Sequence, residues 1–121
     1  MSLFANHVCY KPFTYENLYN RWKLHEQSHW QTAEVPMHDD IDDWNDKLSH
    51  PQKEFLTNIF RFFTQGDIDV ATAYSDIFLP LLGKLSEAKM MMMSFSSREA
   101  THIDAYSHII ETLGMPSRTY I

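Results

Sequence analysis

The sequence predicts an all-α fold that forms half of a helical bundle: two long antiparallel helices preceded by an N-terminal helix. The chain has 121 residues but only three glycines and five prolines, and these are well spaced, which favours long helices over a turn-rich β fold. Apolar residues make up 44% of the chain, and many recur at helical intervals. We therefore expect a single helical domain over residues 1–121.

The N-terminal third is expected to begin irregularly and then to form helices. Residues 1–13 are predicted to be an irregular arm. Thr14 is a suitable N-cap for a helix that continues to about Trp30. Pro36 and the acidic residues after it indicate a loop, followed by a short helix near residues 40–48.

The acidic cluster of Asp39, Asp40, Asp42 and Asp43 resembles a metal-binding loop at first sight. It lacks the central glycine and the terminal glutamate of a calcium-binding loop. We interpret these carboxylates as charges at a helix start on a solvated surface.

Two long helices are expected in the remainder of the chain. Pro51 suits the first turn of one helix, and Pro80 and Gly83 mark the break after it. The second helix is predicted over residues 86–113, ending at Gly114.

Charge and composition exclude several classes of partner. The formal net charge of −6 argues against nucleic acid, because phosphate binding needs a basic surface. No segment approaches the roughly 20 apolar residues of a membrane span, and no signal peptide is recognisable. Cys9 is the only cysteine, which excludes an intrachain disulfide. We expect a cytoplasmic protein.

The segment SFSSREATHIDAYSHII carries the chemistry that stands out most. Glu99, His102 and Tyr106 are three and four residues apart, so they share one helix face inside an apolar run. Glu-x-x-His is the pair with which four-helix carboxylate proteins bind two iron or manganese ions. Alone, the pair is also compatible with a surface Glu and His, or with a core histidine bonded to a carbonyl.

A second acid strengthens the metal hypothesis. Asp67 lies on the preceding long helix, and both Asp67 and Glu99 would sit about 22–24 Å from the intervening turn, at 1.5 Å rise per residue. Asp67, Glu99 and His102 are therefore expected to meet between antiparallel helices. Asp69 is nearly level but faces elsewhere, and the choice between Asp67 and Asp69 stays open if the helix is bulged.

Three segments together resemble the small, radical-generating subunit of class I ribonucleotide reductase. HWQTAEV is similar to an aromatic-Trp segment of that family, FRFFTQGD to its first aspartate helix, and REATHIDAYSHII to its Glu-x-x-His-x-x-x-Tyr helix. Their order and approximate spacing agree with the N-terminal portion of the family from about residue 15 to residue 116. The resemblance implies a ferritin-like, all-helical fold.

The resemblance also implies roles for individual residues. Asp67, Glu99 and His102 would be ligands of a di-iron or di-manganese centre, and Tyr106 would be oxidised to a tyrosyl radical. Trp30 would belong to the electron-transfer route to the large catalytic subunit. That assembly reduces ribonucleotides to deoxyribonucleotides for DNA replication. Without the resemblance, Tyr106 is still favoured by its place one turn past His102, although a core tyrosine with a bonded hydroxyl is the alternative, whereas Trp30 is better explained as a core or interface anchor.

The chain differs from the family in length and in ligand number. Family subunits take further carboxylates and a histidine from a second helix pair, and a C-terminal tail docks the large subunit; neither is present here. Three explanations stay open: an incomplete gene product, a split protein with a separate second chain, and a symmetric homodimer. We favour the homodimer, since two copies supply four carboxylates and two imidazoles and cover exposed apolar faces. Two alternative functions follow: a truncated, ferritin-like di-metal-binding homodimer without reductase activity, or a metal-free helical interaction module.

Overall fold

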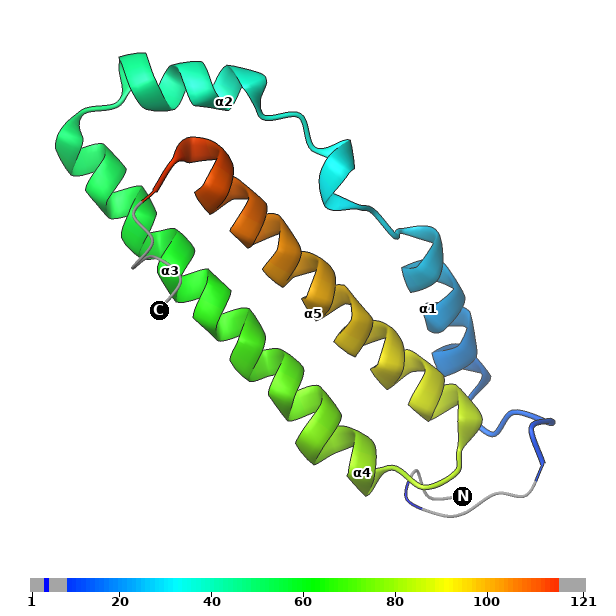
Figure 1. The fold of residues 1–121 in the computed structure, drawn as a ribbon. Helices are drawn as coiled ribbons and strands as arrows, with labels where there is room; N and C mark the ends of the chain where they lie inside the picture. Colours follow the sequence, from blue (N-terminus) through cyan, green and yellow to red (C-terminus); the bar gives the residue numbers. More distant parts are fainter. Residues whose placement is uncertain (1–3, 5–8, 116–121) are drawn as a thin grey trace. The chain divides into compact units, whose positions relative to one another are not determined.

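All the regular secondary structure in the described part of the chain is helical. A computed structural model describes Phe4 and residues 9–115. No strand occurs among these residues, which confirms the predicted all-α class (Figure 1). Most of the predicted irregular arm, residues 1–13, lies outside the described residues.

The helices follow one another with short connections. Five are α-helical: α1 (Glu16–Gln27), α2 (His38–Asp42), α3 (His50–Thr72), α4 (Leu79–Leu81) and α5 (Ser86–Leu113). A 3₁₀ turn, Thr32–Glu34, precedes α2, and two π-helical segments, Asp43–Lys47 and Ala73–Phe78, follow α2 and α3. None of the described helices combines the length and the apolar character that crossing a bilayer requires.

The chain divides into two compact units. The first comprises Met1–His29 and Val70–Ala100, and the second comprises Trp30–Asp69 and Thr101–Ile121, each within the described residues. In each unit, a segment of α3 and the residues after it run beside a segment of α5 in the opposite direction (Figure 1). The predicted antiparallel arrangement of the two long helices is thus present within each unit.

In the first unit, α1 begins where a side chain from α5 holds it. The Glu87 carboxylate accepts hydrogen bonds from the backbone N–H groups of Thr14 and Tyr15, both at 2.8 Å. Burial raises the pKa of Glu87, but these bonds, its own backbone N–H and the Ser86 hydroxyl outweigh burial and place the pKa below its ordinary value. The predicted N-cap, Thr14, is wrong: Tyr15 occupies that position, with no side-chain capping hydrogen bond, and Glu87 binds the backbone at Thr14 and Tyr15.

The other end of α1 is also tied to α5. The Arg98 guanidinium donates from Nη1 to the Ser28 carbonyl at 3.0 Å and from Nη2 to the His25 carbonyl at 2.9 Å. A cation at these carbonyls complements the negative end of the helix dipole. The helix ends at Gln27, before the predicted end at Trp30.

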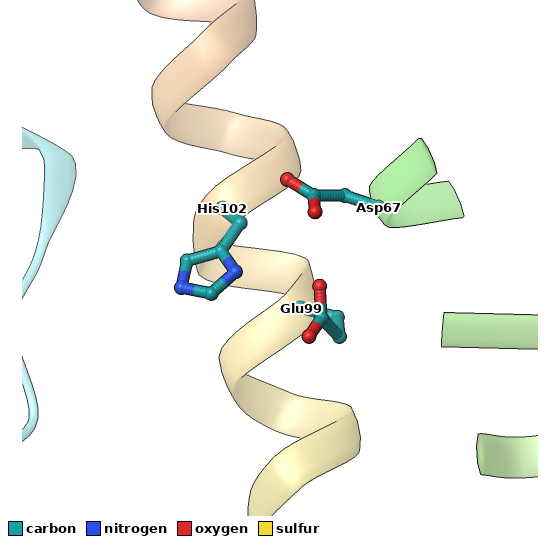
Figure 2. A group of neighbouring side chains, drawn as sticks. All are labelled: Asp67, Glu99 and His102. Carbon is teal, nitrogen blue, oxygen red and sulfur yellow. The ribbon is translucent and has the colours of Figure 1, made fainter. Parts of the chain in front are cut away.

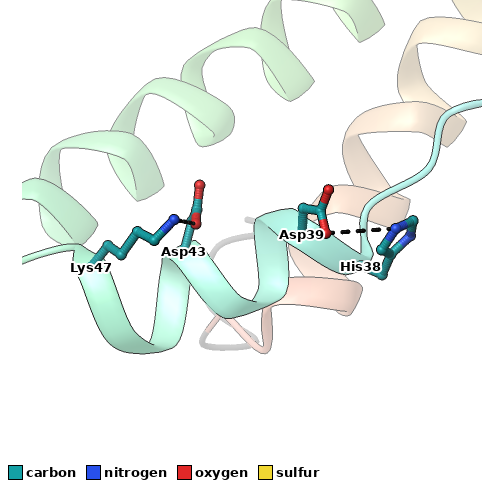
Figure 3. Close-up of polar contacts among 4 residues, drawn as sticks. All are labelled: His38, Asp39, Asp43 and Lys47. Atoms are coloured by element: carbon teal, nitrogen blue, oxygen red, sulfur yellow. Dashed lines mark ion pairs between the residues drawn. The ribbon is translucent and has the colours of Figure 1, made fainter.

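In the second unit, α2 starts at His38 and carries the acidic cluster. Asp39 and Asp40 lie in its first turn with exposed side chains, as predicted for solvated helix-start charges. The ion pairs near it join His38 to Asp39 at 3.6 Å and Lys47 to Asp43 at 2.6 Å (Figure 3). Exposed pairs of this kind contribute little to stability.

The second long helix, α5, has the predicted bounds. It runs from Ser86 to Leu113, and Gly114 follows with a φ of 70°. That left-handed conformation is the usual helix ending for glycine, and the Met115 N–H bonds to the Ile110 carbonyl at 3.1 Å.

Few described side chains are fully buried, and the buried apolar ones come mainly from α5. Leu85, Ala88 and Met91 are buried in the first unit, and Ile110 and Met115 in the second. By contrast, α3 and the residues after it expose large apolar side chains, with exposed fractions up to 73% at Phe62: Phe55, Phe62, Phe63, Ile68, Val70, Ile77, Phe78 and Leu81. Such apolar surface is typical of a face that packs against a partner.

Candidate metal centre

Asp67, Glu99 and His102 form one group of possible metal ligands. Each offers one ligand atom, and these atoms all lie within 4.8 Å of one another. Figure 2 shows Asp67 reaching from α3 towards α5, where Glu99 and His102 occupy successive turns. Asp67 and His102 belong to the second unit, and Glu99 is placed relative to His102 by the α5 helix that carries both.

The surroundings of Asp67 fit a cation. Its Oδ2 atom is buried and has no hydrogen-bond partner among the described residues. A buried carboxylate oxygen without a donor is costly, and a metal ion removes that cost by direct coordination. Carboxylate oxygens with an imidazole nitrogen are donors that suit iron or manganese.

Asp69, the alternative acid on α3, lies in different surroundings. Its side chain is exposed and accepts a hydrogen bond from Gln65 Nε2 at 3.1 Å. It is not part of the group that Asp67, Glu99 and His102 form. The structure therefore brings together the trio expected from the equal heights of Asp67 and Glu99.

Tyr106 lies one turn beyond His102 on α5, between two phenylalanines of α3. Its ring stacks on Phe63 with centroids 5.8 Å apart and planes at 6°, and it contacts Phe60 at 6.2 Å. Burial, and to a lesser extent the nearby charge of Asp67, raises the pKa of Tyr106 above its ordinary value of 10.0. The phenol is therefore protonated at neutral pH.

Trp30 lies against the histidine of the group. Its indole stacks on the His102 imidazole, with ring centroids 6.3 Å apart and planes at 29°. Both rings, together with Tyr106 and His108, line a cavity of about 340 Å³ whose other walls are mostly apolar. The two aromatic residues singled out from the sequence thus both lie next to His102.

Two polar residues near this group make hydrogen bonds that were not predicted from the sequence. Asp104, two residues after His102, accepts a hydrogen bond from the Thr32 hydroxyl at 2.5 Å. Arg98, one residue before Glu99, binds the end of α1 as described above. Arg98 and Asp104 stand out in the sequence as charged residues of the REATHIDAY segment. Their charge alone, however, does not show which groups they bind.

The fold and the donor set define a helical protein with a candidate carboxylate–histidine metal site. Comparisons with known proteins extend this description. The family model described as ribonucleotide reductase, small chain, matches residues 7–120. The chain is 59% identical over 120 residues to the "Probable ribonucleoside-diphosphate reductase small subunit 376L" of Invertebrate iridescent virus 6, covering 99% of this chain and 33% of that protein.

Two further relatives agree. The chain is 47% identical over 120 residues to the "Probable ribonucleoside-diphosphate reductase small subunit 048L" of Invertebrate iridescent virus 3, covering 99% of this chain and 31% of that protein. It is 31% identical over 101 residues to the "Ribonucleoside-diphosphate reductase small chain" of Monkeypox virus, covering 84% of this chain and 31% of that protein. The chain belongs to the ribonucleotide reductase small chain family. It spans about a third of the length of these relatives.

Proposed function

We propose that this chain is a small-subunit component of class I ribonucleotide reductase in which Asp67, Glu99 and His102 hold iron or manganese. The observation that carries the proposal is their convergence within 4.8 Å, with Asp67 Oδ2 buried and without a hydrogen-bond partner among the described residues. In this proposal the protein works in the cytoplasm, beside a large subunit that holds the ribonucleotide.

Tyr106 is the proposed radical site. When bound, the di-metal centre supplies the one-electron oxidation of the phenol. With O₂ as the terminal oxidant, Tyr106 would give one electron to the loaded centre and its phenolic proton to solvent, which would leave a neutral tyrosyl radical. Its pKa, raised by burial and by Asp67, keeps the proton on the oxygen before oxidation, and the rings of Phe60 and Phe63 pack against it.

Trp30 is proposed to connect this site to the large subunit. The stack of the indole on the His102 imidazole supports this proposal, because an electron-transfer residue is useful beside a proposed metal ligand. The alternative, a packing role alone, predicts that Trp30 can be replaced by Phe without loss of radical transfer.

A second copy of the chain is the proposed partner that completes the centre. One copy supplies two carboxylates and one imidazole to the group. Two copies related by a two-fold axis supply four carboxylates and two imidazoles, the donor set of di-metal carboxylate bundles. The apolar side chains that α3 exposes give this association a driving force.

A second candidate function is metal binding without reductase activity. The three donors of this chain favour it, because they are half of a complete di-metal donor set. In that case the metal-loaded chain reacts with O₂ as a simple oxidase, or not at all. A metal-free interaction module is the third possibility, and it requires that neither iron nor manganese binds.

The test is metal loading with two matched variants. Asp67→Asn removes a donor charge from the group, and Asp69→Asn removes an exposed charge two residues away. We expect Fe²⁺ and Mn²⁺ binding by the wild type and by Asp69→Asn, and a loss of about tenfold or more in affinity in Asp67→Asn.

Electron paramagnetic resonance separates the candidate functions. A tyrosyl signal after addition of Fe²⁺ and O₂, absent in Tyr106→Phe, supports the radical-generating function. Bound metal without that signal favours the non-reductase metal protein. Equal metal binding by wild type and Asp67→Asn would contradict the proposed centre.

A further inference from the structure

We propose that Arg98 and Asp104 are positioning residues that together hold the Trp30 indole against His102. Both lie on α5, the helix that carries Glu99 and His102, and each binds the N-terminal segment close to Trp30. That this positioning serves electron transfer rests on the proposed function of Trp30. The hydrogen bonds themselves are independent of that function.

Arg98 fixes the chain before Trp30. Its two terminal nitrogens bind the carbonyls of His25 and Ser28, at 2.9 and 3.0 Å. These carbonyls lie at the end of α1, where the regular helical hydrogen bonds run out, and the His25 carbonyl also accepts from the Ser28 N–H at 3.2 Å. A planar guanidinium binds two acceptors at fixed positions, so Arg98 sets both where α1 ends and where the chain leaves it.

Asp104 fixes the chain after Trp30. The Thr32 hydroxyl donates to Asp104 Oδ2 at 2.5 Å, and the bond is charge-assisted because the acceptor is a carboxylate. Thr32 begins the 3₁₀ turn Thr32–Glu34, and Glu34 accepts from the Gln31 N–H at 2.6 Å, which stiffens that turn.

Trp30 lies between these two attachment points, two residues after Ser28 and two before Thr32. So short a segment with both flanks bound has little freedom, since each fixed residue removes backbone entropy. The stack on His102, with ring centroids 6.3 Å apart, is the geometry that results.

The decisive experiment uses metal-free protein in which Trp22 and Trp44 are replaced by Phe, so that fluorescence reports Trp30 alone. Thr32→Val removes the hydroxyl donor and keeps the side-chain shape, and Arg98→Ala removes the other attachment. We expect each to raise acrylamide quenching of Trp30 about twofold, because losing a hydrogen bond to a charged group shifts a local equilibrium about tenfold.

Three further variants make the result specific. Asp104→Ala should act like Thr32→Val, and Asp104→Asn should restore much of the protection, because its amide oxygen still accepts. Glu111→Ala, an exposed acid on the same helix, should change nothing. Helical circular dichroism checks that each variant is folded. Unchanged quenching in Thr32→Val and Arg98→Ala, or an equal change in Glu111→Ala, would overturn the proposal.

A second readout separates this inference from the proposed function. Co²⁺ bound beside His102 should quench Trp30 fluorescence, and the two attachment variants should weaken that quenching at equal metal occupancy. If Co²⁺ does not bind the wild type, the proposed function fails, while acrylamide quenching still decides whether Arg98 and Asp104 hold Trp30.

Discussion

Three acidic residues show how surroundings set the chemistry of a carboxylate. Asp69 is exposed and accepts a hydrogen bond from the Gln65 side chain, one turn away on the same helix. Glu87 is 1% exposed, and its buried charge is satisfied by the backbone N–H groups at the start of α1. Asp67 has a buried oxygen with no such donor among the described residues. Of the three, Asp67 is the one whose surroundings favour a cation.

Glu87 makes the stability of the chain dependent on pH. Its folded-state pKa lies below the ordinary value of 4.5, so its contribution is present above that pH and is lost as pH falls through the lower folded-state value. We expect Glu87→Ala to lower the free energy of unfolding at neutral pH by about 1–3 kcal/mol, because two part-buried N–H groups lose a charged acceptor.

Urea denaturation across pH provides the measurement. Glu87→Gln is the matched control, since it keeps an acceptor oxygen but does not titrate. The stability difference between wild type and Glu87→Gln should be constant above pH 4.5 and shrink in more acidic solution. A difference that grows on acidification would contradict the assignment.

Tyr106 should lose its phenolic proton at a higher pH than an ordinary tyrosine. Burial is the larger cause of its raised pKa and the charge of Asp67 the smaller, so metal-free Asp67→Asn should lower the pKa partway towards 10.0. Because the folded-state pKa is raised, the associated stability is present below pH 10.0 and declines as pH rises beyond it. Ultraviolet difference titration of wild type against Tyr106→Phe measures this, and an unshifted Tyr106 would show that the ring is solvated.

At the scale of elements, local signals predicted some helix ends and could not predict others. The end of α5 at Leu113 follows from Gly114, whose φ of 70° suits glycine. The start of α1 at Glu16 depends on Glu87, more than 70 residues away in the chain, so no local pattern indicates it. The π-helical segment Ala73–Phe78 was also missed, because a single wider turn has no distinctive local sequence pattern.

The candidate site was also predictable only in part, because some of its geometry is local to one helix and some depends on contacts between distant segments. Glu99, His102 and Tyr106 share one helix face by spacing alone, and Asp67 follows from equal distances to the turn. The stack of Trp30 on His102 joins segments far apart in the chain, and only the resemblance to a family pointed to Trp30. The partners of Arg98 and Asp104 are backbone and hydroxyl groups of the N-terminal segment, which carry no sequence signature.

Replacing each of two glycines by alanine should change the stability of the chain in opposite directions. Gly66 lies inside α3, and an added Cβ would meet nothing within 4 Å, so Gly66→Ala should stabilise the chain by about 0.5–1 kcal/mol. Gly114 also has open space, but its φ of 70° disfavours an L side chain, so Gly114→Ala should destabilise by about 1 kcal/mol.

Thermal unfolding of the two variants gives the comparison directly. Each variant serves as the control for the other, because both add the same methyl group in open surroundings. A destabilising Gly66→Ala would show that α3 is closely covered at that position.

At the scale of the whole molecule, exposed apolar surface and an incomplete donor set are the features to explain. Large side chains on α3, among them Phe55 and Phe62 with exposed fractions of 64% and 73%, are unusual for a chain that works alone. The proposed second copy covers such surface and completes the donor set. Without metal, however, two copies would bring four carboxylates together, and these would repel one another.

Association should therefore depend on metal. We expect sedimentation equilibrium to show tighter dimerisation with Mn²⁺ than without, and the metal effect should disappear in Asp67→Asn and persist in Asp69→Asn. A monomer under both conditions would contradict the homodimer.

The most direct test of the central claim is a crystal structure of the Mn²⁺- or Fe²⁺-loaded chain with anomalous data at both metal edges. We predict anomalous density within direct coordination distance of Asp67, Glu99 and His102, about 2.0–2.2 Å from each ligand atom. Anomalous density elsewhere, or its absence at this group in fully loaded crystals, would contradict the proposed centre.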